Sequence, residues 1–226
     1  MRHRDLAYVV DYLSPAGTLR GRETCRVSVH GDGQRTARTV SEIFDTEILR
    51  DVTLTVDRAF RPIEAFVRTR QHDRLLGSGW FRFEGTMAEA ECWSPSEGRS
   101  SQRLALASPA KSFLSHAVTL DVWHAAGISH DAAAGVQGLS PLPTCSPLHN
   151  GATAPRLGLW PLSAAFVGIE TVETPAGRFE ALHERLYEAD GTAFLETWCS
   201  ADEDRVMLRM HYPVYDTMYV LAKLER

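Results

Sequence analysis

The side chains best suited to proton transfer in this sequence fall into two groups, and the first comprises His116, Asp121, His124, His130 and Asp131. Asp121 and His124 are three residues apart, so they would be neighbours on a helix, where the carboxylate could orient the imidazole and raise its basicity. The alternative is that the histidines lie at the surface or cap a helix beside incidental acids. The spacing predicts an acid–base pair wherever this stretch forms a helical turn.

Metal and cofactor chemistry find little support in the sequence. His116 and His124 would be more than about 25 Å apart on a strand, and about 12 Å apart and rotated by about 80° on a helix. The cysteines form no Cys-x-x-Cys pair and lie far apart, at Cys25, Cys92, Cys145 and Cys199. Phosphate-binding and dinucleotide-binding glycine motifs, the His-Glu-x-x-His helix and the Gly-x-Ser-x-Gly elbow do not occur. We therefore expect no metal site and no cofactor.

The second group lies near the end of the sequence and contains His211, Tyr215 and Tyr219. These three side chains project to one side if a bend at Pro213 preserves the alternation of a strand. An imidazole and a phenol that face a dry cavity suit a general acid and base, because burial moves their pKa values toward the working pH. The alternative is a last strand that packs its tyrosine rings on the core.

Arginines within the expected strands are candidates for holding an anionic substrate. A guanidinium that faces a cavity donates two parallel hydrogen bonds to a carboxylate or enolate. The alternative is that most of these side chains point outward. The candidates for substrate binding are Arg68, Trp80, Arg82, Arg209 and Tyr219.

Turn-forming clusters divide most of the sequence into segments that suit β-strands. They lie at residues 14–17, 30–33, 71–73, 84–85, 94–98, 174–177, 190–191 and 201–204. Between the clusters apolar residues alternate, as do Val52, Leu54 and Val56. About ten to twelve strands of ordinary length are expected, and that number favours a closed or strongly curved sheet. We predict an all-β antiparallel meander that forms an open or closed barrel with one short helix or lid.

This strand pattern stops between residues 112 and 160. A long irregular segment in a regular scaffold often carries binding and catalytic groups. Ser108 and Pro109 would begin a helix over residues 109–126, but the central residues of that stretch also alternate as in a strand, so both readings stay open. We predict one barrel domain over residues 1–226, with the irregular insertion covering its cavity.

The net charge of −5 and the pI near 6.0 argue against a nucleic-acid partner, because phosphate binding needs a concentrated basic patch. No run approaches the roughly 18 apolar residues of a membrane span. The first residues are too few and too polar for the apolar region of a signal peptide. We therefore predict a soluble, cytoplasmic protein without a nucleic-acid or membrane partner, and a homodimer remains open.

The strand Gly77-Ser78-Gly79-Trp80-Phe81 and the hairpin over residues 172–179 resemble those of uncharacterised bacterial open-barrel proteins that are broadly lipocalin-like. The resemblance spans most of the sequence and implies a barrel or half-barrel around an apolar cavity. It implies no catalytic residue. Many proteins of this general shape are exported lipid carriers.

Two functional hypotheses follow. The first is a cofactor-free enzyme, of the lyase, isomerase or hydratase type, that acts on a small hydrophobic or aromatic molecule in the cavity. Its catalytic residues would be drawn from His116, His124, Asp121, His211 and Tyr215. The second is a lipocalin-like protein that binds such a molecule without chemistry. Convergence of titratable groups in the cavity would favour the enzyme, and a uniformly apolar cavity would favour the binding protein.

Overall fold

The first half of the protein is a meander of eight antiparallel strands. The computed structural model describes residues 3–139 and 142–226. The strands are β1 (Arg4–Leu13), β2 (Leu19–Val29), β3 (Arg35–Ile43), β4 (Ile48–Val56), β5 (Pro62–Gln71), β6 (Arg74–Glu84), β7 (Met87–Ser94) and β8 (Gly98–Ala105). Alternate residues are buried along most of β1 to β7, because successive side chains of a strand point to opposite faces. The edge strand β8 has no buried residue. In β4 the buried set is Ile48, Arg50, Val52, Leu54 and Val56.

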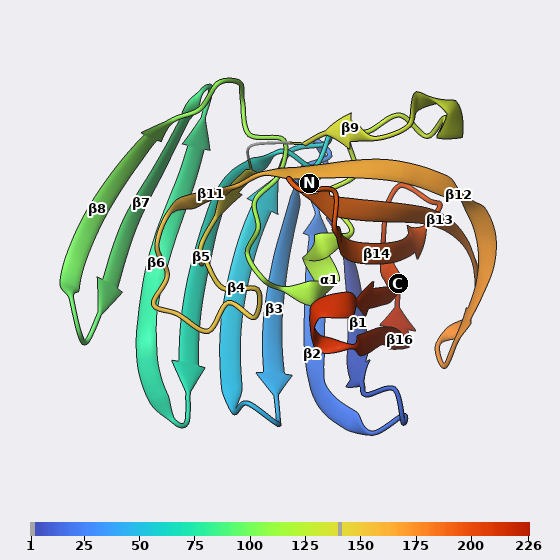
Figure 1. Cartoon of the computed structure of the whole chain (residues 1–226), viewed down its shortest axis with the longest axis horizontal. Helices are drawn as coiled ribbons and strands as arrows, with labels where there is room; N and C mark the ends of the chain where they lie inside the picture. Colours follow the sequence, from blue (N-terminus) through green and yellow to red (C-terminus); the bar gives the residue numbers. More distant parts are fainter. Residues whose placement is uncertain (1–2, 140–141) are drawn as a thin grey trace.

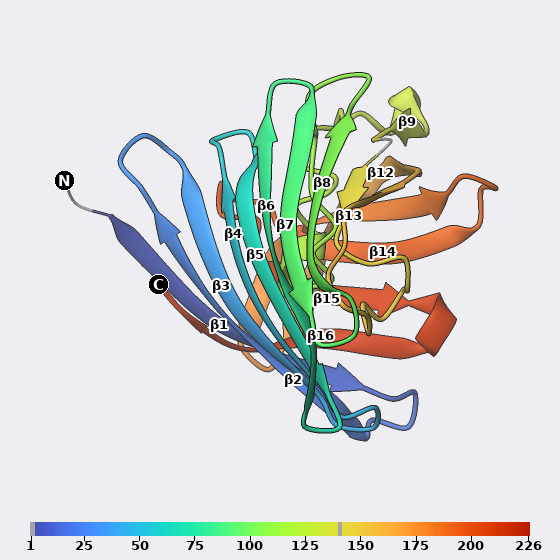
Figure 2. The same ribbon diagram turned by 90° about the vertical axis from the view of Figure 1, so that its left-hand side faces the viewer.

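The second half adds five long strands to the same sheet. They are β12 (Leu162–Thr174), β13 (Gly177–Glu188), β14 (Ala193–Ser200), β15 (Met207–Tyr212) and β16 (Thr217–Glu225), with the 3-10 turn η2 (Pro213–Tyr215) before the last. Strand β16 pairs antiparallel with β1, and Tyr219 lies opposite Tyr12. This pairing joins the two meanders, and Figure 2 shows the strands of the second half running roughly across those of the first.

The sheet is strongly curved but does not close. Its fourteen strands run in the order β8-β7-β6-β5-β4-β3-β2-β1-β16-β15-β14-β13-β12-β9, and within the described residues β8 and β9 (Gln137–Gly138) are its two unpaired edges. Figure 1 shows the first eight strands side by side, with the connecting segment in front of them. The predicted all-β antiparallel fold is confirmed, and the barrel is open.

The connection from β8 to β12 packs against the buried face of the sheet. It contains the short helix α1 (Val118–Asp121), the 3-10 turn η1 (Ala132–Ala134), and the two-stranded pair β10 (Leu142–Thr144) and β11 (Gly158–Trp160). Neither the helix nor the strand considered over residues 109–126 forms at full length. His116 has a φ of 59°, in the left-handed region, and this interrupts both. Among the described residues, no helix has the length and hydropathy of a membrane span.

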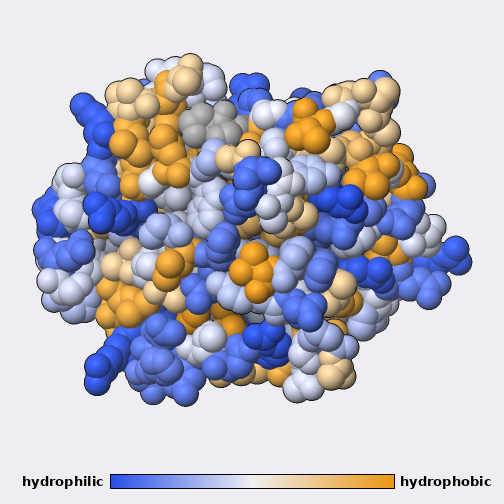
Figure 3. All heavy atoms as spheres, viewed as in Figure 1, coloured by the Kyte–Doolittle hydropathy of each residue, from blue (hydrophilic) through white to orange (hydrophobic). Residues whose placement is uncertain are grey.

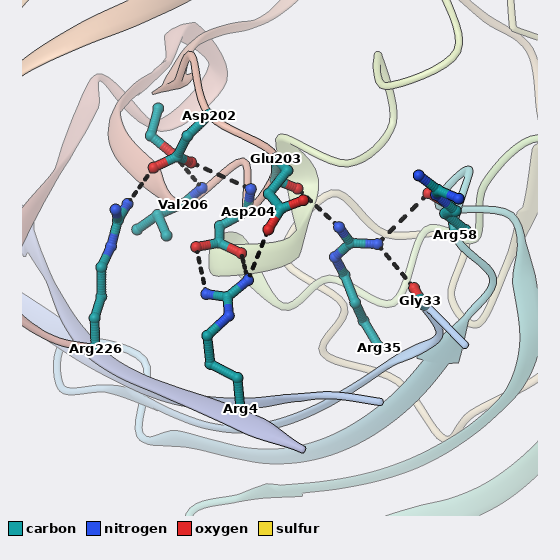
Figure 4. Close-up of polar contacts among 10 residues, drawn as sticks. Arg4, Gly33, Arg35, Arg58, Asp202, Glu203, Asp204, Val206 and Arg226 are labelled. Atoms are coloured by element: carbon teal, nitrogen blue, oxygen red, sulfur yellow. Dashed lines mark hydrogen bonds and ion pairs between the residues drawn. The ribbon is translucent and has the colours of Figure 1, made fainter. Parts of the chain in front are cut away.

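An ionic clamp fixes the second half of the sheet to the first (Figure 4). Arg4 of β1 donates from Nη1 to Asp204 Oδ2 at 2.8 Å and from Nη2 to Oδ1 at 2.6 Å. Arg35 of β3 donates from Nη2 to the carbonyl oxygen of Glu203 at 2.9 Å. The loop between β14 and β15 is thereby tied to two strands that precede it by more than a hundred residues.

The face of the molecule seen in Figure 1 offers no single apolar surface. Figure 3 shows hydrophilic residues over most of it, interrupted by separate hydrophobic groups. Such scattered exposure is ordinary for a folded protein. The features that point to function lie in the interior.

Candidate functional site

A cavity lies between the buried face of the sheet and the connecting segment. It has an empty volume of about 740 Å³, including the part open to solvent. Five aromatic side chains line it, namely Tyr12, Tyr212, Tyr215, Tyr219 and Phe194. Its polar lining includes Arg50, His116, Asp121, His149 and Asn150, together with Arg20 and Asp45. An aromatic wall and a polar group of side chains therefore share one cavity.

The aromatic wall is built by rings that brace one another. The ring centroids of Tyr12 and Tyr219 are 4.6 Å apart with an interplanar angle of 71°. Tyr212 lies 5.4 Å from Phe194 and 5.2 Å from Tyr215, both in edge-on arrangements. Burial raises the pKa of the Tyr212 and Tyr219 phenols. These hydroxyls therefore stay protonated at neutral pH and can donate hydrogen bonds to a ligand.

Asp121 lines the cavity and lies within hydrogen-bonding distance of His124. Asp121 ends α1, and its Oδ1 lies 3.2 Å from His124 Nε2. His124 Nδ1 lies 2.6 Å from Ser112 Oγ. When Asp121 is ionised it can only accept, so Nε2 carries the proton of a neutral His124, and the Ser112 hydroxyl donates to Nδ1. Burial raises the pKa of Asp121, while the hydrogen bond from His124 opposes the rise.

These three side chains are those of a serine, histidine and aspartate triad, but their order relative to the cavity is reversed. Asp121 lines the cavity, whereas Ser112 and His124 are absent from its lining. In a nucleophilic triad the serine must meet the substrate. Here Ser112 is buried behind the imidazole, and the carboxyl group is the end that a ligand can reach. The arrangement suits proton transfer by Asp121.

Glu23 of β2 positions the helix that carries Asp121. Its carboxylate accepts from the backbone N–H of Val118 at 3.1 Å and of Thr119 at 2.8 Å, which are donors at the start of α1. It also accepts from the hydroxyls of Tyr12 at 2.9 Å, Ser41 and Thr119. A carboxylate at a helix N-terminus satisfies N–H groups that have no partner within the helix. Through Glu23 of β2, the sheet thus fixes the position of the first turn of α1.

His116 lines the cavity as a neutral imidazole. Burial, and then the charge of Arg50, lower its pKa to about 3. Its Nε2 lies 3.3 Å from both Thr144 Oγ1 and the Ser146 carbonyl oxygen. Within the described residues, no group of three or more His, Cys, Asp or Glu side chains is arranged to hold a metal ion. His116 therefore acts in the cavity as a polar, uncharged group.

The buried His116 is expected to make the protein lose stability in acid. Because the pKa is about 6.5 in the unfolded state and about 3 in the folded state, the unfolded state binds the proton first. Stability is thus fully present above the unfolded value and falls as pH drops toward 3, by up to about 1.4 kcal/mol per pH unit. We expect His116→Asn, which tolerates a positive φ, to flatten the decline in urea unfolding free energy between about pH 6.5 and pH 4.

His72→Asn is the matched control, because His72 also has a positive φ, of 48°, but its side chain is exposed. Wild type and His116→Asn are compared at the same pH values and ionic strength. Parallel pH profiles for these two proteins would show that His116 does not cause the acid lability.

Arg50 is a buried cationic group of the cavity that the sequence interpretation missed. It lies on β4 with a side chain that is almost wholly buried, and its Nη1 and Nη2 donate to the backbone carbonyls of His116 and Asn150. The alternation of β4 predicts its buried position, because Arg50 points to the same side of the strand as Val52 and Leu54. The signal that could have identified it is a charged residue at a position where the alternation of the strand calls for an apolar one.

Four of the expected substrate-binding residues lie outside the cavity, and this corrects their assignment. Arg68 donates to Asp51 at 3.0 Å and Arg82 to Glu84 at 3.0 Å, both on the exposed face. Trp80 shares that face because its neighbours Gly79 and Phe81 pack inward. The guanidinium of Arg209 lies 5.7 Å from the Trp198 ring centroid, away from the cavity.

His211 is also misplaced by the sequence interpretation. In β15 its neighbours Met210 and Tyr212 are buried, so His211 faces the other side, and its Nε2 lies 3.7 Å from Asp216 Oδ1. The 3-10 turn η2 breaks the alternation, which brings Tyr212, Tyr215 and Tyr219 to the cavity together. Of the expected catalytic residues, His116, Asp121 and Tyr215 line the cavity, and His124 stands directly behind Asp121.

Comparisons with known proteins identify a fold. No protein-family model and no curated protein matches the chain. A beta-barrel-like protein of the domain of unknown function DUF1849 from Brucella abortus is similar over 99% of this chain and 96% of its own, with a TM-score of 0.56 and 11% identity. The predicted resemblance to uncharacterised bacterial open-barrel proteins is confirmed at the level of fold.

Two further solved structures match this chain with lower TM-scores. A proposed exported protein with a YmcC-like fold from Bacteroides fragilis and a proposed lipoprotein from Parabacteroides distasonis each match with a TM-score of 0.32 and 9% identity. Each match covers 98% of this chain and 95% of the other. These two proteins are described as exported and as a lipoprotein, so the cytoplasmic location predicted from the sequence is corrected and no location is assigned to this chain.

Proposed function

We propose that this protein is an enzyme that moves a proton on a small hydrophobic or aromatic molecule, with Asp121 as the acid–base group. One observation carries the proposal: Asp121 lines the cavity while His124 and Ser112 hold it from behind. A buried titratable group in an aromatic cavity is a physical signature of acid–base sites. Lyase and isomerase reactions use such a group.

In the proposed reaction the Asp121 carboxylate takes a proton from the ligand and becomes a carboxylic acid. It then returns the proton to another atom of the same molecule, or to its leaving group. The His124 Nε2–H stabilises the carboxylate form, and the protonated hydroxyls of Tyr212 and Tyr219 can donate to an oxygen on which negative charge develops. His124 and Ser112 touch Asp121 only from behind, so they are positioning residues.

The test needs no knowledge of the product. Phenols, aromatic ketones and aromatic carboxylates that raise the melting temperature are incubated with the protein in D₂O, and NMR follows deuterium incorporation at carbon. We expect Asp121→Asn to lower the exchange rate by about 100-fold or more while ligand affinity stays within about threefold. Asp51→Asn is the control, because Asp51 pairs with Arg68 on the exposed face.

Ser112→Ala separates this reaction from nucleophilic catalysis. Because Ser112 acts through His124, we expect its loss to lower exchange by less than about tenfold and to shift the pH profile of exchange. An Asp121→Asn variant that exchanges as fast as wild type would overturn the proposal.

Binding without chemistry is the second candidate function. It is favoured by the five aromatic side chains of the wall and by the slight exposure of Asp121, whose side chain is only 11% accessible. A wild-type protein that binds the panel but exchanges no proton would establish this function in place of the first.

A further inference from the structure

Three of the described arginines have almost wholly buried side chains, and one of them is paired with a carboxylate. Arg205 donates from Nη2 to both carboxylate oxygens of Glu184, at 2.7 and 2.6 Å. Arg35 lies over the ring of Phe60 at 4.4 Å and is attracted by the charge of Asp204. Arg50 is the third, with 2% of its surface exposed, and it forms no salt bridge with any described residue. A buried charge that contacts no opposite charge destabilises the folded protein unless a bound group supplies that opposite charge.

The guanidinium of Arg50 is held in place and still has free donors. Its two Nη atoms donate to carbonyls of two segments of the connection, at His116 and Asn150. Gly151 fits so closely that a Cβ there would lie 2.6 Å from Nη2. A guanidinium has five N–H donors, so with two used here three remain, and the buried Nε has no partner among residues 3–139 and 142–226. The group is therefore immobilised beside the cavity with hydrogen-bonding capacity unused.

The acidic groups nearby are already engaged. Asp45 accepts from Arg20 Nε at 2.6 Å, and Glu23 is absent from the cavity lining and accepts from five donors. Asp121 is hydrogen-bonded to His124, and the charge of Arg50 acts on it without a direct ion pair. In the described part of the chain, Arg50 is the cation of this cavity that has no acidic side chain in contact, whereas Arg20 is paired with Asp45.

We propose that the cavity selects ligands that carry a carboxylate, which binds the guanidinium of Arg50 while the hydrophobic body of the ligand lies against Tyr212, Tyr219 and Phe194. This inference rests on the proposed function only in that the cavity binds a small molecule. It names the ligand class, an aromatic or hydrophobic carboxylate, and it holds whether or not Asp121 moves a proton. A planar carboxylate matches the fork of a guanidinium and supplies the missing counter-charge.

The test compares carboxylates with their uncharged counterparts. Calorimetry or ligand-observed NMR measures the affinity of phenylacetate and cinnamate and of the corresponding primary amides. We expect wild type to bind each carboxylate about tenfold or more tightly than its amide. In Arg50→Met the carboxylates should lose about 10- to 100-fold in affinity while the amides change by less than about threefold, so that the preference disappears.

Arg35→Met is the matched control, since Arg35 is similarly buried but does not line the cavity, and it should keep the preference. Arg50→Lys keeps the charge and should retain a reduced preference for carboxylates. This variant takes the place of Arg50→Met in the test if Arg50→Met does not fold. An equal or higher affinity of wild type for the amides would overturn the inference, as would an unchanged preference in a folded Arg50→Met. If no pair binds, the inference and the proposed function both fail. If binding depends on Arg50 but no proton exchanges, only the proposed chemistry fails.

Discussion

Arg205→Met is expected to destabilise the protein by about 3 to 5 kcal/mol, because it leaves a carboxylate buried without its cation. Glu184 is fully buried, and both of its oxygens accept from Arg205. The same guanidinium donates to the carbonyl oxygen of Val122 at 3.1 Å, so it also joins β13 to the segment after α1. After the substitution, His130 is the group that remains beside Glu184, at 3.4 Å. Urea unfolding at neutral pH measures the loss.

A double variant shows whether the loss comes from the orphaned charge or from the pair itself. Replacing both residues by methionine removes the two charges together, and we expect it to recover most of the stability lost by Arg205→Met. Arg22→Met is the control for removing an arginine, because Arg22 pairs with Asp11 at the surface, and it should cost less than about 1 kcal/mol. An Arg205→Met protein as stable as Arg22→Met would contradict the assigned role.

The strands were predictable because their signal is local. The alternation of apolar residues is a property of short stretches of sequence, and so are the turn clusters. The strands and turns of the sheet follow both. Whether the sheet closes is set by its accumulated twist and by the pairing of its edges, which no short stretch records. The pairing of β1 with β16 joins residues more than two hundred positions apart, so the open barrel had to be observed.

The candidate site was predictable where its geometry is local and not where it depends on which face of a strand is covered. Asp121 and His124 meet because three residues separate them in a single helical turn. Arg68 and Arg50 both lie on strands, and only the packing of the connection over the sheet makes the face of Arg50 the inner one. His211 was assigned to the cavity by extending a period of two across Pro213, where the chain forms a 3-10 turn instead.

Glu23→Met is expected to cost about 3 to 5 kcal/mol of folding free energy, because five buried donors lose their acceptor at once. These donors come from β1, from β3 and from the first turn of α1. Glu23→Gln should be intermediate, since its amide keeps one oxygen but presents N–H groups to donors. Glu42→Met is the control: Glu42 lies on the adjacent strand with its side chain exposed, and its loss should stay within about 0.5 kcal/mol.

Glu23 also links the stability of the fold to the position of Asp121. Its Oε1 accepts from both the backbone N–H and the hydroxyl of Thr119, two residues before Asp121. Replacing Thr119 by valine removes one donor and keeps the side-chain shape, so a double-mutant cycle with Glu23→Gln isolates that contact, and we expect a coupling of about 1 kcal/mol or more. Strictly additive losses would mean that the Thr119 hydroxyl contributes nothing to this link, which would then rest on the backbone N–H groups of Val118 and Thr119.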